Sequence, residues 1–171
     1  MAPRLSPQPT VTLVFTTSSS LLARAIRRVT NSPVSHVAIS LPLAGVPVML
    51  HADVGGVQIV PASRFFYGRT LVEEYALTPG THYNIERAIE DIGERYDYFG
   101  LLGHLARLTF VRFGIRLRRP LTSSHATVCS EFVARLGLPS FANLDPERTS
   151  PGELLLVCRS APELVKVKWS R

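Results

Sequence analysis

The chain has 171 residues, of which 46% are hydrophobic, and it carries a formal net charge of +6 at pH 7 with a pI near 9.9. This size and composition predict one domain with a core of its own. The chain contains two cysteines, Cys129 and Cys158. Two cysteines exclude a disulfide scaffold, and these two match no paired metal-ligand spacing.

Residues 1–9 contain three prolines and no continuous apolar run. They predict a flexible N-terminal segment, followed by a single domain over residues 10–171. We expect neither a secretory signal nor a membrane-spanning segment. A cytoplasmic location follows from that expectation, with a phage-associated or otherwise exported protein as the alternative.

The first half of the chain is predicted to be mainly strands. Short β-branched or apolar stretches bounded by turn residues predict strands at 10–16, 34–40, 46–52, 57–60 and 70–77. The second, third and fourth of these follow one another through short turns, which predicts an antiparallel meander. A serine run at 18–20 caps a short helix with an apolar face from Leu21 to Val29. Residues 63–67 predict one helical turn.

The second half is predicted to be mainly helical. Apolar residues from Ile85 to Ile92 recur at helical spacing, and residues 101–111 form a second apolar stretch. A third helix is expected over 129–136, and a fourth begins near Pro151, a residue favoured at the first helical position. Residues 164–169 alternate as a final strand. The chain is therefore predicted to be an α+β protein.

Cys129 lies at the start of the third helix and is the candidate nucleophile. Phe132, Val133 and Leu136 follow it at three, four and seven residues and share one helical face. The unpaired N–H groups and the positive end of the helix dipole favour a thiolate there. The same N–H groups suit an oxyanion formed on an attacked carbonyl. The alternative is an inert cysteine buried as a small apolar residue.

Two histidines on neighbouring predicted strands are the candidate partners of this cysteine. In the 34–40 strand, Val34, His36 and Ala38 are expected on one face, with Val37 on the other. His51 lies near the end of the next strand. A hairpin between the two strands brings its ring within reach of the His36 ring.

Arginine residues supply most of the positive charge and cluster in two places. The first cluster is Arg24, Arg27 and Arg28, and the second contains five arginines between residues 107 and 119. Such clusters suit anionic polymers, nucleic acid or lipid headgroups. The alternative is an ordinary solvated face, because no nucleic-acid-binding motif accompanies them.

The order of these motifs resembles the permuted branch of the NlpC-type papain-like superfamily, which includes YiiX-like proteins and relatives of lecithin:retinol acyltransferase. The resemblance is carried by short motifs spread over nearly the whole chain. They are residues 35–39, 49–52, 96–101, 129–133 and 149–154. It implies a circularly permuted papain-like fold, with a small antiparallel sheet or barrel packed against helices.

The resemblance also implies roles for individual residues. Cys129 is the implied nucleophile, His36 the general base, and His51 the third residue that orients His36 by a hydrogen bond. Tyr96 or Tyr98 is a candidate oxyanion donor. The chemistry is acyl transfer through a thioester, and it needs no metal or organic cofactor.

The favoured function is a cysteine peptidase or amidase that cuts cell-wall peptide or a related amide. A lipid acyl hydrolase or acyltransferase is the second enzyme hypothesis, and a noncatalytic binding or structural module of the same fold is the third. A zinc site formed by His36, His51 and Cys129 is a further alternative. The oligomeric state is left open.

Overall fold

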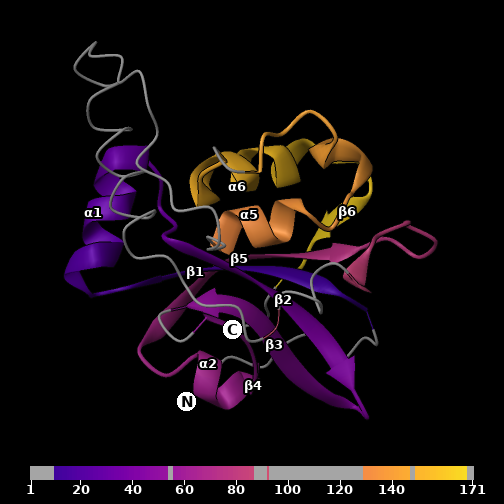
Figure 1. Cartoon of the computed structure of the whole chain (residues 1–171), viewed down its shortest axis with the longest axis horizontal. Coiled ribbons are helices and arrows are strands. Elements are labelled where there is room, and N and C mark those ends of the chain that lie inside the picture. The colour runs from indigo at the N-terminus through magenta and orange to yellow at the C-terminus, as the bar shows by residue number, and fades with distance from the viewer. Residues whose placement is uncertain (1–9, 54–55, 87–91, 93–128, 147–148, 169–171) are drawn as a thin grey trace.

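The computed structural model describes residues 10–53, 56–86, 92, 129–146 and 149–168. Within these residues the chain forms one six-stranded antiparallel sheet with helices on both of its faces (Figure 1). This confirms the predicted α+β class. Several predicted features lie outside the described residues, namely the segment 1–9, Tyr96, Tyr98, the helix at 101–111 and the arginines at 107–119.

The strands and helices of the first half follow the prediction closely. They are β1 Thr12–Ser18, α1 Leu21–Thr30, β2 His36–Leu43, β3 Val46–Asp53, β4 Gly56–Pro61, α2 Ala62–Phe65 and β5 Arg69–Leu77. Ser20 caps α1 and accepts a hydrogen bond from the Ala23 N–H. The β2–β3 turn is shorter than expected, because Ala44 and Gly45 both adopt positive φ and close a two-residue hairpin.

The C-terminal part supplies helices for one face of the sheet. They are α5 Cys129–Ala134, the short 3-10 helix η1 Pro139–Phe141 and α6 Pro151–Ser160, followed by the edge strand β6 Leu164–Lys166. The predicted helix starts at Cys129 and Pro151 are confirmed. Every helix in the described part of the chain is too short or too polar to cross a membrane.

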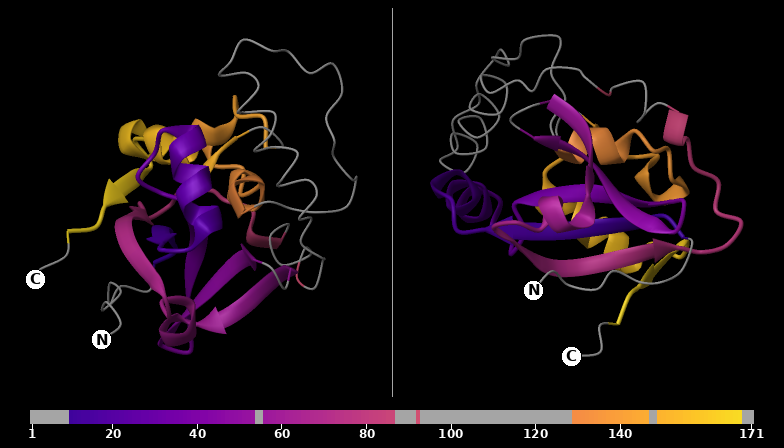
Figure 2. Two further views of the ribbon diagram at one scale, coloured as in Figure 1. Left: turned by 90° about the vertical axis from the view of Figure 1, so that its left-hand side faces the viewer. Right: turned by 90° about the horizontal axis from the view of Figure 1, so that it is seen from below.

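The sheet has the order β4-β3-β2-β1-β5-β6, so the first strand lies inside it rather than at an edge. The antiparallel β2–β3–β4 meander is confirmed. β1 pairs with β2 along one edge and with β5 along the other, and the register of the β1–β5 pair shifts between Phe15 and Thr16. Figure 2 shows the curvature of the strands from two further directions.

Each face of the sheet is covered by its own apolar cluster. On the face that we call the α5 face, Leu13, Phe15, Val37 and Ile39 pack with residues of α5 and α6 such as Phe132. On the opposite face, here the α2 face, a smaller cluster joins the sheet to α2. Its members are Val14, Ala38, Met49, Val60, Phe65 and Phe66. The central strands are thus buried on both sides.

The start of α6 is fixed by a capping box and by a close contact. The Ser150 hydroxyl accepts from the Glu153 N–H, while the Glu153 carboxylate accepts from the Ser150 N–H. At Gly152, an added Cβ would lie 2.5 Å from the Ser32 Cβ. This helix turn therefore lies directly against the loop that joins α1 to β2.

We expect Gly152→Ala to destabilise the protein by about 1–3 kcal/mol through overpacking. In an open helix the same change stabilises, because alanine is the better helix former. Urea unfolding measures the difference. In a Ser32→Gly background, which removes the side chain that the new Cβ would meet, Gly152→Ala should cost much less stability. Equal stability of Gly152→Ala and the parent would contradict the contact.

Candidate active site

His36 and His51 lie side by side on the α2 face. Their ring centroids are 5.5 Å apart and the rings meet edge-on, which confirms the expected juxtaposition. β2 and β3 pair antiparallel, and alternation places His36 and Ala38 on one face and Val37 on the other, as predicted. Val34 packs with Val37 instead, because β2 begins only at His36 and the alternation does not reach back to residue 34.

The two rings form one aromatic cluster with Phe65 of α2. Its ring centroid lies 5.9 Å from that of His36 and 5.1 Å from that of His51. Arg69, the first residue of β5, lies over the same ring, with its guanidinium carbon 4.9 Å from the Phe65 centroid. It also donates to the Phe65 carbonyl oxygen at 2.9 Å and forms an ion pair with Asp53.

Burial and positive charge keep both imidazoles neutral. Burial, the neighbouring His51 ring and the Arg69 guanidinium lower the pKa of His36 to about 3. Burial and Arg69 lower the pKa of His51 to about 4, although Asp53 opposes the change. Each ring keeps one buried nitrogen, Nε2 of His36 and Nδ1 of His51, without a hydrogen-bond partner among the described residues. These two nitrogens therefore do not form the expected orienting bond.

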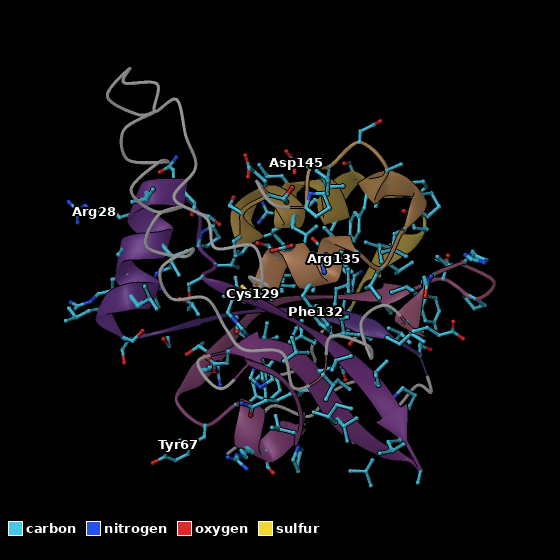
Figure 3. All side chains as sticks on the ribbon, in the orientation of Figure 1. Arg28, Tyr67, Cys129, Phe132, Arg135 and Asp145 are labelled. Carbon is cyan, nitrogen blue, oxygen red and sulfur yellow. The ribbon has the colours of Figure 1, made fainter. Side chains whose placement is uncertain are left out.

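Cys129 begins α5 and lies on the other face of the sheet. It packs in the same cluster as Val37 and Phe132, and only 4% of its surface is exposed. Figure 3 shows its sulfur at the start of α5, beside the strands. The backbone N–H groups of Val37 and Ser130 point at this sulfur closely enough to favour its thiolate.

The structure thus unites the two histidines but separates their rings from the cysteine. His36 and Val37 are consecutive, so the N–H that faces the sulfur belongs to the peptide unit directly after His36. The His36 ring, however, points to the α2 face with Phe65. The sulfur and the ring lie on opposite sides of the same strand.

The expected thiolate is not what this environment favours. Burial raises the pKa of the Cys129 thiol to about 11, and this outweighs the nearby N–H groups. The buried thiol is closer to the alternative expectation of an inert cysteine than to the thiolate expected at a helix start.

Three residues beside the histidines were not predicted from the sequence: Asp53, Phe65 and Arg69. Asp53 could have been found, because it lies two residues after His51 and therefore on the same strand face. Phe65 comes from α2 and Arg69 from the start of β5, on the two sides of a short turn that contains Gly68 at positive φ. Their approach depends on how that turn folds back on the sheet.

Comparison with solved structures finds a related fold. The metalloprotein YiiX from Escherichia coli O157:H7 (DUF1105) superposes with a TM-score of 0.53 at 18% sequence identity, over 96% of this chain and 99% of that chain. The fold is YiiX-like. No family model matches the chain, and no curated protein matches it. At this identity the likeness describes architecture alone, so the residue roles rest on the geometry given above.

The neutral histidines predict a particular dependence of stability on pH. Unfolded histidine titrates near pH 6.5, whereas His36 and His51 titrate at about 3 and 4 in the folded chain. Between pH 4 and 6.5 the unfolded chain binds more protons. The free energy of unfolding should therefore fall as pH falls through this window, by about 1.4 kcal/mol per pH unit for each histidine. Above pH 6.5 the stabilising contribution of the two neutral histidines is complete.

Urea unfolding of the parent, His51→Gln and the exposed-site control His82→Gln between pH 4.5 and 7.5 measures this effect. The slope should decrease in His51→Gln and stay at the parent value in His82→Gln. Identical slopes in all three proteins would contradict a buried neutral His51.

The raised thiol pKa predicts slow alkylation of Cys129. In a Cys158→Ala background, the rate with iodoacetamide should rise roughly tenfold per pH unit between pH 7 and 10, because only the thiolate reacts. Mass spectrometry of the labelled peptide measures the rate. A rate that is already constant near neutral pH would show an activated thiolate and would contradict the environment described here.

Proposed function

We propose that the chain is a thiol-dependent acyl hydrolase, with Cys129 as nucleophile, His36 as general base and His51 as the residue that supports His36. The observation that carries this proposal is that Cys129 packs in the same apolar cluster as Val37, the residue after His36. The nucleophile and the base thus share one end of β2. His51 lies beside the base on the neighbouring strand.

Each step uses groups that this chain provides. The sulfur attacks the carbonyl carbon of an amide or ester, and the thiol proton passes to His36, which later protonates the leaving amine or alcohol as its bond to carbon breaks. We assign stabilisation of the oxyanion to the backbone N–H groups near the sulfur, those of Val37 and Ser130. Water, activated by His36, then cleaves the thioester and restores the thiol.

The proposed reaction requires the His36 ring to turn toward the sulfur. His36 is the first residue of β2 and only half-buried, so the direction of its ring depends on the backbone at one strand end. The chemistry starts from a neutral thiol and a neutral imidazole, because burial disfavours charge on both. The thiol proton is therefore transferred during the attack rather than before it.

We propose amide bonds of cell-wall or related peptides as the first substrate class, and lipid acyl esters as the second. The basic helix α1 supports an anionic polymer as a binding partner. Arg24, Arg27 and Arg28 line an open hollow with Ser32, and Figure 3 shows Arg28 projecting from α1. Either substrate passes through the same thioester.

A metal ion does not fit the described residues. YiiX is described as a metalloprotein, but the described part of this chain gathers no group of three His, Cys, Asp or Glu side chains that could hold a metal ion. The two imidazoles meet edge-on, and beside them Asp53 is ion-paired with Arg69. No step of the proposed mechanism passes through a metal.

Reaction with p-nitrophenyl butyrate tests the proposal. We expect a burst of p-nitrophenol and a butyryl adduct on the Cys129 peptide, both absent in Cys129→Ala. His36→Ala should slow acylation about 100-fold or more, as loss of a general base does. Mass spectrometry locates the adduct.

Two matched variants control this experiment. Cys158→Ala removes the other buried thiol and His82→Ala removes an exposed histidine, and both should acylate at the parent rate. An adduct on Cys158, or equal rates in His36→Ala and His82→Ala, would overturn the assignment.

A noncatalytic module of the same fold is the second candidate. The observation that favours it is the placement of Cys129 and His36 on opposite faces of the sheet, with the thiol buried and neutral. Such a module would use α1 and its arginines to hold an anionic partner. Absence of any acyl adduct on Cys129 with both ester and peptide substrates would favour this function.

A further inference from the structure

A small pocket opens on the α2 face, on the side of the sheet away from Cys129. Its volume is about 160 Å³, and His51, Asp53, Gln58, Val60, Arg64, Phe65 and Arg69 line it. These residues come from β3, β4, α2 and β5, so four elements converge on one hollow. Six of the seven side chains are polar, charged or aromatic.

Arg69 is held in place before any ligand arrives. Its guanidinium lies over the Phe65 ring, donates to the Phe65 carbonyl oxygen and pairs with Asp53. These two hydrogen bonds use two of its five N–H donors. The remaining donors are held in a fixed direction, which reduces the entropy that a ligand would otherwise lose in ordering them.

The pocket has an excess of positive charge and of donors. Arg64 is exposed and has no ion-pair partner among the described residues, whereas the charge of Asp53 offsets that of Arg69. The Gln58 amide adds a neutral donor. His51 is 4% exposed, and its buried Nδ1 has no partner within the described part of the chain.

We propose that this pocket binds a phosphate group. Two guanidinium groups, an amide and an imidazole reach it from separate elements, which suits an anion with acceptor oxygens pointing in several directions. Guanidinium–phosphate bonds are among the stronger hydrogen bonds in proteins. A planar carboxylate has only two oxygens and would leave part of this donor set unused. The phosphate is either a free anion or a monoester headgroup.

This site goes beyond the proposed hydrolase and does not depend on it. The pocket lies on the α2 face, whereas the sulfur lies on the α5 face, so phosphate should bind equally well to Cys129→Ala. His51 is common to both proposals. For that reason the test changes Arg64 and Gln58, which have no part in the proposed acyl transfer.

Calorimetric titration of the whole chain with inorganic phosphate at pH 7.5 and low salt tests the proposal. We expect saturable binding with one site. Arg64→Gln should weaken it tenfold or more, and Gln58→Glu should abolish it by placing a carboxylate in the pocket. Urea unfolding midpoints confirm that both variants remain folded.

Arg28→Gln is the matched control, because it removes the same charge from the exposed helix α1. It should bind phosphate like the parent. A parallel titration with glycerol 1-phosphate distinguishes the two sources of the phosphate group. If it binds at least as tightly as inorganic phosphate does, the ligand is a monoester; if it binds more weakly, the ligand is the free anion.

Three outcomes would overturn the proposal. The first is the absence of saturable phosphate binding. The second is an equal loss in Arg28→Gln and Arg64→Gln, which would show attraction to overall charge. The third is acetate binding as tightly as phosphate, which would assign the pocket to carboxylates.

Discussion

The burial of β2 and β3 on both faces governs everything else in this structure. In a strand, successive side chains point to opposite sides, and here each side has its own apolar cluster to fill. Val37 and Leu50 therefore serve the α5 face, while His36 and His51 serve the α2 face. A shift of one residue in either strand would exchange the two sets, so the packing fixes the register and with it the face on which His36 and His51 lie.

The same burial decides the charge state of the site. Desolvation by burial is the largest cause of the pKa change in both imidazoles and in the thiol. The charged groups nearby, Arg69 and Asp53, are paired with each other. The result is a neutral set of potential acids and bases, two imidazoles and a thiol, with the Arg69–Asp53 ion pair beside the imidazoles.

Much of this arrangement follows from the sequence, and the parts that do not have physical reasons. Local patterns are sufficient for the strand that carries His36, the hairpin that brings His51 to it, and the helix that opens at Cys129. The face on which α5 packs is not a local property, because it depends on contacts with strands from the first third of the chain. Nor does a helix start reveal how deeply its first residue is buried, and burial decided the thiol pKa.

The inner position of β1 has a consequence for how the protein is made. β1 is synthesised early, but its partner β5 ends at Leu77, and the helices described on the α5 face, α5 and α6, begin at Cys129 and Pro151. At about 5–20 residues per second, the ribosome needs several seconds to deliver them. During that interval Leu13, Phe15 and Ile39 have no cover from α5. The α5 face of the nascent sheet therefore gains its cover from α5 and α6 only as the last third of the chain emerges.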